Sequence, residues 1–312
     1  MNHDLAIIIP AYKPDFFIDA VKSVLTQTDR RFSLYIFDDA SPHNLKDLLI
    51  QNNLFDKVQY HRFDENVGQI SLVRHWNRCV ESTNNEPWVW LFSDDDLMDP
   101  ACVEQFYQTI GKHPEHPAYR FNTKKISSEK EIIRENIFPE TFGASDFLNI
   151  KLSHEQESYI VEFIFSREAY KIAGGFPDIP LAWAADDMFW VKISANHKIR
   201  TIPGAEVLWR YSGGNISSKN SKKIARIKLE SSRRFVNWIE EQDELKKSLV
   251  PKDLTAYWYA RQIRSLQSYL NLHDELSAVL KMKHNRKTVL RHYMRMKKER
   301  SRVFGWLKKF LS

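Results

Sequence analysis

The stretch WVWLFSDDDLMDP, residues 88–100, runs from five apolar residues through a serine into three consecutive aspartates. A short apolar run that ends in turn-forming residues predicts a buried β-strand. Three adjacent carboxylates repel one another and raise their own pKa values unless a positive charge lies among them. Mg²⁺ and Mn²⁺ prefer oxygen ligands, so a divalent cation is the simplest such partner. The stretch therefore predicts a strand that carries Asp94, Asp95 and Asp96 to a metal-diphosphate site, although Asp96, like Asp99, could instead form a turn or cap the next helix.

Strand and helix patterns alternate along the N-terminal half of the chain. This alternation predicts an α/β fold in which helices flank a mostly parallel sheet. Every predicted strand ends in polar residues, which collect at the carboxyl edge, where open α/β sheets bind ligands. The expected strands are residues 5–12, 33–41, 57–63 and 87–96, and the expected helices are residues 16–27, 44–53 and 70–83.

The middle of the chain adds further elements, and the C-terminal part changes character. Residues 159–178 read as a strand and a helix that ends at Gly174-Gly175, residues 182–198 as a helix, and residues 199–217 as a last strand. Only helical patterns follow. We therefore predict an α/β domain over residues 1–217 and an α-helical region over residues 218–312.

Composition limits the class of protein. The 312 residues are 43% hydrophobic, which is enough for a substantial core. The two cysteines, Cys79 and Cys102, lack the spacing of a disulfide framework or a zinc site. The first residues lack the features of a secretion signal, and no stretch approaches the length of about 20 apolar residues that spans a bilayer. We expect a cytoplasmic protein that is either free or bound peripherally to the cytoplasmic membrane face.

The positive charge is concentrated at the C-terminus. The chain carries a net charge of +6, but residues 281–312 contain twelve Lys or Arg and one acid, so residues 1–280 carry −5. Apolar and aromatic residues alternate with these cations, as in a helix that lies on an anionic membrane surface. A helix packed on its own domain would show the same pattern. Both readings stay open here.

A second acidic pair, Asp38-Asp39, closes the expected strand at residues 33–41. By itself this pair is typical of a turn, in which aspartate bonds to nearby backbone. In a parallel sheet, however, it would lie at the same edge as the aspartate run at residues 94–96. One of the two carboxylates could then bind a base or ribose.

Five segments together closely resemble the nucleotide-diphospho-sugar domain of family 2 glycosyltransferases, which has the GT-A fold. The resemblance extends over residues 4–217, and the C-terminal hundred residues show none. The five segments are residues 7–41, which contain IIIPAYKPD, residues 64–80, which read DENVGQISLVRHWNRCV, residues 90–100, IAGGFPD at residues 172–178 and AADDMFW at residues 184–190.

The resemblance implies a nucleoside diphosphate sugar as donor, most often a UDP-sugar, and Mn²⁺ or Mg²⁺ as cofactor. By matching motif positions, it implies contacts to the donor or the ion for several residues. The donor-binding positions are Pro10, Ala11, Tyr12, Asp38, Asp39, Asn66, Gly68, Arg74, Asn77, Asp94 and Asp95, and the metal positions are Asp94 and Asp96. The Asn66–Trp76 spacing is about three residues longer than in the relatives this chain most resembles. Ser212-Gly213-Gly214 stands where the family often has a histidine.

The resemblance also implies a catalytic base at Asp187. It places Asp186, which stands where the family usually has glutamate, in the acceptor or sugar pocket together with Trp183 and Gly175. In transfer with inversion, a carboxylate takes the proton of the acceptor hydroxyl as that oxygen attacks the anomeric carbon. Asp186 could instead be the N-cap of its helix. Gly175 would let the backbone approach the acceptor, and Trp183 would stack on a sugar ring or pack in the core.

The leading expectation is a metal-dependent glycosyltransferase that serves polysaccharide or cell-surface glycan biosynthesis, with a glycan or lipid-linked acceptor and no nucleic-acid partner. A sugar-phosphate nucleotidyltransferase is one alternative, but IIIPAYKPD lacks the Gly-rich basic loop of that class. A nucleic-acid-binding protein is another alternative, and it rests on the basic tail alone. The acidic body of residues 1–280 argues against it, because a nucleic-acid-binding face is expected to be basic.

Overall fold

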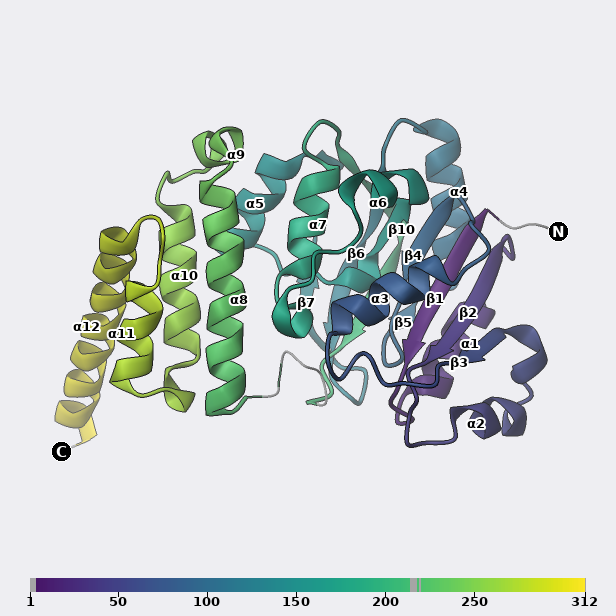
Figure 1. The fold of residues 1–312 in the computed structure, drawn as a ribbon, viewed down its shortest axis with the longest axis horizontal. Helices are drawn as coiled ribbons and strands as arrows, with labels where there is room; N and C mark the ends of the chain where they lie inside the picture. Colours follow the sequence, from purple (N-terminus) through teal and green to yellow (C-terminus); the bar gives the residue numbers. More distant parts are fainter. Residues whose placement is uncertain (1–3, 214–217, 219, 312) are drawn as a thin grey trace. The chain divides into compact units, whose positions relative to one another are not determined.

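The computed structural model describes residues 4–213, 218 and 220–311, with side chains to residue 298. The chain divides into two compact units (Figure 1). One contains Met1–Phe147 and Gln156–Asn215, and the other contains Leu148–Glu155 and Ile216–Ser312. The predicted boundary at residue 217 lies outside the described residues, as do the side chains of the tail from residue 299 onward.

The first unit is built on one twisted sheet, in the order β3-β2-β1-β4-β9-β6-β10-β5, with β7 paired to β6 and β8 to β10. The four strands predicted in the N-terminal half are parallel to one another, while β9 runs antiparallel between β4 and β6. The strands are β1 (Leu5–Ala11), β2 (Phe32–Asp38), β3 (Gln59–Arg62), β4 (Trp88–Leu91), β5 (Leu97–Met98), β6 (Ala118–Ile126), β7 (Ile132–Asn136), β8 (Thr141–Phe142), β9 (Phe163–Ser166) and β10 (Ile199–Arg210).

Helices connect these strands, and polar side chains fix where several of them begin. Asn44, Ser71 and Ser166 each accept a hydrogen bond from a first-turn backbone N–H and so cap α2, α3 and α6. Gly174 ends α6 in the left-handed conformation that favours glycine, as the sequence predicted. The helices are α1 (Phe17–Leu25), α2 (Leu45–Gln51), α3 (Leu72–Glu81), α4 (Cys102–Lys112), α5 (Ala144–Ser153), α6 (Arg167–Ala173) and α7 (Ala185–Ile193), with short 3-10 turns at Phe55–Lys57, Ile160–Glu162 and Pro180–Ala182.

The core of this unit lies between the central strands and their helices. Leu5–Ile9 of β1 are completely buried, as expected for a parallel strand covered on both faces. Trp90 of β4 is also buried, stacks on Phe121 at 5.1 Å between ring centroids, and donates its ring N–H to the Val161 carbonyl at 2.7 Å. This packing fixes β4 and the residues that follow it.

The α/β class and the predicted element order are confirmed, with three differences. Strand β4 ends at Leu91, so the aspartates lie on the loop beyond it and not on the strand itself. Strands β6, β7 and β8 and helix α5 lie in residues 113–158, where the sequence pattern predicted no element. The N-cap prediction for Asp186 is wrong, because Ala184 is the N-cap of α7 and Asp186 lies in the first turn.

The second unit is helical throughout its described residues, as predicted. Asn149 of α5 donates to the Ser248 carbonyl and accepts from the Val250 N–H, which ties residues 148–155 to this unit. Tyr259 of α10 is buried between α8 and α11, where its hydroxyl lies 3.4 Å and 3.5 Å from two backbone carbonyls. The helices are α8 (Lys222–Glu240), α9 (Asp243–Ser248), α10 (Leu254–Ser265), α11 (Leu272–Leu280) and α12 (Arg286–Leu311), with a 3-10 turn at Gln267–Tyr269. Within the described part of the chain, no helix is both long enough and apolar enough to cross a bilayer.

Candidate active site

The two acidic groups predicted from the sequence meet at one edge of the sheet. Strands β1, β2 and β4 are parallel, so their carboxyl ends lie side by side. The loop after β1 joins the two groups: Tyr12 donates its N–H to Asp94 Oδ2 at 2.8 Å, and its carbonyl accepts from the Ser41 hydroxyl at 2.7 Å. Asp39 in turn donates its N–H to the Ala11 carbonyl. The predicted convergence at the carboxyl edge is therefore present in the structure.

Asp38 ends β2 and is completely buried. Its Oδ1 accepts from the Ser41 N–H at 2.7 Å, and its Oδ2 accepts from the Tyr60 hydroxyl at 2.6 Å and from Arg62 at 2.7 Å. These contacts are those of a turn-forming carboxylate, which was the structural alternative for this residue. Asp38 anchors β3 and the turn after β2, so a contact with the donor stays a prediction.

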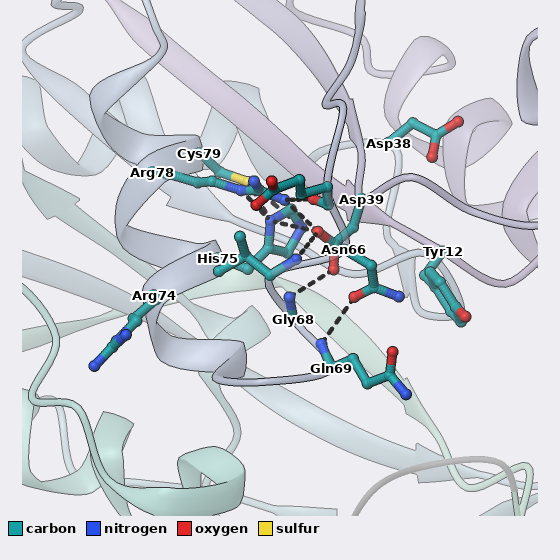
Figure 2. A network of polar contacts seen from close by, with 12 residues as sticks. Tyr12, Asp38, Asp39, Asn66, Gly68, Gln69, Arg74, His75, Arg78 and Cys79 are labelled. Carbon is teal, nitrogen blue, oxygen red and sulfur yellow. Dashed lines mark hydrogen bonds and ion pairs between the residues drawn. The ribbon is translucent and has the colours of Figure 1, made fainter.

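Asp39 lies at the centre of a denser network (Figure 2). Its Oδ1 accepts from the Val67 N–H at 3.0 Å and from Arg78, and its Oδ2 accepts from the Gly68 N–H at 2.8 Å. Arg78 also lies 3.7 Å from the Phe63 ring centroid. Burial raises the pKa of the Asp39 carboxyl, although the Gly68 N–H and Arg78 act in the opposite direction. Asp39 thus joins the loop before α3 to α3 itself.

Gly68 is required by this network. A Cβ atom at this position would lie 2.4 Å from Asp39 Oδ2, closer than real Cβ contacts allow. The side chain of the neighbouring Asn66 accepts the Gln69 N–H at 2.8 Å, which shapes the same turn. Figure 2 shows Asn66 and Gly68 beside Asp39. The predicted donor positions 66 and 68 therefore lie together with Asp39, and they shape the loop around its carboxylate.

The aspartate run after β4 is held differently. Asp94 Oδ2 accepts the N–H groups of Tyr12 and Lys13, each at 2.8 Å. The Lys13 amine pairs with Asp95 Oδ2 and lies 3.6 Å from Asp94 Oδ1. Asp95 Oδ1 accepts from the Ser93 hydroxyl at 2.6 Å. A cation therefore does lie among these carboxylates, and in this structure it is a lysine.

Asp96 connects the run to the last strand of the sheet. Its Oδ1 accepts the backbone N–H of Arg210 at 2.6 Å. The Arg210 guanidinium donates to the backbone carbonyl of Asp95 at 2.8 Å. The partner of Asp96 lies on β10 and not at a helix start, so the cap alternative for this residue is wrong. Burial raises the pKa of the carboxyls of both Asp94 and Asp96. Asp99 does form a turn, because its side chain accepts the Ala101 N–H.

Whether these residues fit a divalent ion follows from their chemistry. Over the described residues, no three His, Cys, Asp or Glu side chains converge in a metal-binding arrangement. Mg²⁺ typically takes only one or two carboxylates and fills its other positions with water and substrate phosphates. Asp94 Oδ1 already lies 3.6 Å from one cation, the Lys13 amine, and the Asp96 carboxylate accepts the Arg210 backbone N–H through its Oδ1, so Asp94 and Asp96 fit the one or two carboxylates that such an ion takes.

A cavity of about 330 Å³ opens beside this run. Its walls include the Lys13 and Asp95 side chains, so the charged groups face free space. The complete lining is Lys13, Asp15, Phe16, Asp95, Ser128 and Ser212. None of the residues that the sequence predicted for the acceptor contributes to this lining.

Two predicted donor residues on α3 are engaged elsewhere. Arg74 is mostly exposed, pairs with Asp178 at 2.8 Å, and points away from Asp39 in Figure 2. Asn77 donates to the Phe176 carbonyl at 3.0 Å and accepts from the Phe176 N–H at 3.0 Å. The Asn77 amide therefore holds the Gly-Gly-Phe loop. A Cβ at Gly175 would lie 3.1 Å from the Asn77 Oδ1. The backbone at Gly175 therefore lies close to the Asn77 amide, and a close approach to the acceptor stays a prediction.

The predicted catalytic group lies at the start of α7. Asp187 is in the first turn and 4% exposed, and Asp186 beside it is partly exposed. The positive end of the helix dipole favours carboxylates at this position. Trp183, two residues before the helix, is also partly exposed. The roles of Asp187 as base and of Trp183 in sugar stacking stay predictions.

Sequence reasoning missed two cations at this site, Lys13 and Arg210. Lys13 directly follows the predicted Pro10-Ala11-Tyr12 segment, and its position next to that motif was the available signal. Arg78 lies within the matched segment at residues 64–80, one helical turn beyond Arg74, but the sequence pattern did not predict which of the two contacts Asp39. Arg210 is completely buried at the end of β10, and nothing local marked its contact with residues more than a hundred positions earlier.

With this geometry established, the sequence can be compared with known proteins. It matches the model of glycosyl transferase family 2 over residues 6–170, more than half of the chain. This chain belongs to glycosyltransferase family 2. The family resemblance is thereby confirmed, and the protein is a glycosyltransferase. The matched range ends before Gly175 and Asp187, so it does not test their roles.

Solved structures of low sequence identity share the fold of this glycosyltransferase. It is similar to S. aureus TarS 1–349 in complex with UDP-GlcNAc, with a TM-score of 0.65 and 14% identity over 91% of this chain and 83% of that one. It is also similar to GalNAc-T7 with UDP, GalNAc and Mn²⁺, with a TM-score of 0.55 and 15% identity over 91% of this chain and 54% of that one. No curated protein matches the sequence. These neighbours confirm the GT-A fold.

Proposed function

We propose that this glycosyltransferase moves a sugar from a nucleoside diphosphate donor, with uridine as the base, to a hydroxyl of a glycan or lipid-linked acceptor, with inversion. One observation carries the proposal: the Tyr12–Lys13 segment ties both acidic groups to one sheet edge, beside a cavity of about 330 Å³. The fold neighbours support the donor class, since TarS 1–349 was crystallised with UDP-GlcNAc and with UDP.

Three aspartates would divide the work of transfer. Asp94 and Asp96 would hold a divalent ion, which would supply positive charge to the departing diphosphate when bound. The backbone contacts of both carboxylates fix their orientation before any donor arrives. Asp187 would accept the proton of the acceptor hydroxyl. One base is sufficient for this reaction, and no covalent intermediate is needed.

A thermal-shift screen of nucleotide sugars, with and without Mn²⁺, tests the donor class and the metal together. We expect one class of donor to raise the melting temperature only when Mn²⁺ is present. Asp96→Asn keeps an oxygen for the Arg210 N–H and removes the charge, so it should abolish the shift without loss of the fold. A shift of equal size in Asp96→Asn, or a shift in the absence of Mn²⁺, would rule out the proposed ion site.

We also propose that α12 lies on an anionic membrane that contains the acceptor. Val289 and Tyr293 are buried, whereas Leu290 and Met294, one residue further on, are 40% and 54% exposed. The exposed pair is flanked by cations at positions 291, 295 and 298. Replacing Leu290 and Met294 with glutamate should prevent sedimentation with anionic vesicles. Unchanged sedimentation of that variant would contradict the membrane role.

A further inference from the structure

A hydrogen bond fixes the backbone of Lys13, whereas the side chain that carries its amine is partly exposed. Its N–H donates to Asp94 Oδ2 at 2.8 Å, which fixes where its side chain begins. The amine then reaches Asp95 Oδ2 and lies 3.6 Å from Asp94 Oδ1. The lysine side chain is 35% exposed, whereas the two aspartate side chains are 5–6% exposed. The cation is thus the accessible partner of two buried anions.

The charges explain why this pairing forms. A lysine amine carries a positive charge at neutral pH. This amine contacts the carboxylates of both Asp94 and Asp95. Buried carboxylates are costly without a positive partner, and here the Lys13 amine is that partner.

The same amine borders space that a ligand could enter. Lys13, Ser128 and Ser212 line the cavity of about 330 Å³ that also touches Asp95. A lysine ammonium is a compact charge on a flexible four-carbon stem, so it can leave one anion for another without backbone movement. A lysine amine is also a common ligand for phosphate oxygens.

We propose that Lys13 is an exchangeable counter-ion: its amine neutralises Asp94 and Asp95 before the donor complex forms, and it turns into the cavity to contact the donor's diphosphate when a divalent ion binds at Asp94. The competition with the ion rests on the ion site of the proposed function. The contact with the diphosphate rests on the proposed function. Lys13 would therefore couple occupation of the ion site to binding of the donor.

Binding of Mn²⁺ alone, followed by the electron paramagnetic resonance signal of the free ion, tests the first part. Lys13→Met removes the competing charge and should bind Mn²⁺ about tenfold more tightly than the wild type, a difference of about 1.4 kcal/mol. Lys13→Arg keeps the charge and should stay close to the wild type. Lys46→Met, a charge loss on α2, is the matched control and should not change Mn²⁺ binding. Equal Mn²⁺ affinity in Lys13→Met and the wild type would overturn the counter-ion role.

Titration with UDP in saturating Mn²⁺, followed by calorimetry, tests the second part. We expect Lys13→Met to bind UDP about tenfold more weakly, although it binds Mn²⁺ more tightly. Equal UDP affinity in the two proteins would overturn the diphosphate contact and leave the counter-ion role intact. Absence of UDP binding in the wild type itself would refute the proposed donor instead, and the Mn²⁺ result would still decide the competition.

Discussion

The two acidic groups at the carboxyl edge of the sheet are alike in sequence and different in how they are neutralised. Asp38 and Asp39 bond to backbone N–H groups, to a tyrosine and to arginines that also pack against other parts of the unit. In the run from Asp94 to Asp96, backbone N–H groups hold single oxygens, and the charge is balanced by one partly exposed lysine. The first group is a fixed anchor, whereas the second can exchange its cation.

This difference teaches how like-charged clusters divide between structure and function. A carboxylate whose oxygens are saturated by fixed donors has little capacity left for a ligand, however well it matches a family motif. A carboxylate paired with a flexible lysine is stabilised less by its partner. Replacing that partner by another cation therefore costs less free energy. Accordingly, substitutions at the first group should mainly change stability, and substitutions at the second should mainly change binding.

The largest expected effect is at Asp187, a carboxylate that belongs to neither acidic group. Asp187→Asn should keep Mn²⁺-dependent donor binding and lower the transfer rate about 10²- to 10⁴-fold, because the asparagine cannot take the acceptor proton. Steady-state transfer assays and donor thermal shifts on the same protein check this. Asp186→Asn is the neighbouring control and should retain most of the activity. Retained turnover in Asp187→Asn would remove this residue as the base.

The next effect tests the fixed anchor. Gly68→Ala introduces a Cβ 2.4 Å from Asp39 Oδ2 and should lower the free energy of unfolding by about 1–3 kcal/mol. In an Asp39→Ala background the obstructing oxygen is gone, so the same change should cost less than about 1 kcal/mol. Urea denaturation of the four proteins gives the coupling between the two positions. Additive losses would mean that the Gly68–Asp39 contact is not what requires glycine.

A smaller effect concerns His75, which lies beneath the Asp39 network, its Nδ1 3.5 Å from Asp39 Oδ1. Burial, and then the charge of Arg78, lower the pKa of the His75 imidazole to about 3. Below about pH 6.5 the unfolded chain therefore binds one more proton than the folded protein does. The free energy of unfolding is fully present above that pH and decreases as the pH falls, by at most about 1.4 kcal/mol for each pH unit.

Urea midpoints at pH 7.5 and pH 5.5 measure this loss. The wild type should lose about 1 kcal/mol more than His75→Gln between these values. His43→Gln, which changes an exposed histidine, is the control and should behave like the wild type. Equal losses in the wild type and His75→Gln would show that the imidazole does not titrate in this range.

Much of this arrangement followed from the sequence, because it depends on local patterns. Short apolar runs predicted β1, β2 and β4, of which the last two end in acids, and parallel pairing then required the ends of the three strands to meet. The choice between Arg74 and Arg78 could not be predicted. The two residues lie on the same face of α3, about 6 Å apart along its axis, so the one that reaches Asp39 depends on the position of the whole helix.

Tertiary contacts explain the other omissions. Arg210 reaches Asp95 only because β10 joins the sheet beside β6, at a sequence separation of 115 residues. Likewise, the engagement of the Asp39 oxygens depends on Val67 and Gly68, whose backbone N–H groups carry no sequence signal at all. The acids themselves were evident from the sequence, but the groups that satisfy them were not.

Mn²⁺ binding to Asp94→Asn and Asp39→Asn, measured side by side by electron paramagnetic resonance, tests the contrast between the two acidic groups most directly. Both changes remove one charge from the same sheet edge. Asp94→Asn should weaken Mn²⁺ binding by tenfold or more, about 1.4 kcal/mol, while Asp39→Asn should leave it within about threefold of the wild type and lower stability instead. Equal weakening by both changes, or weakening by Asp39→Asn alone, would contradict the account.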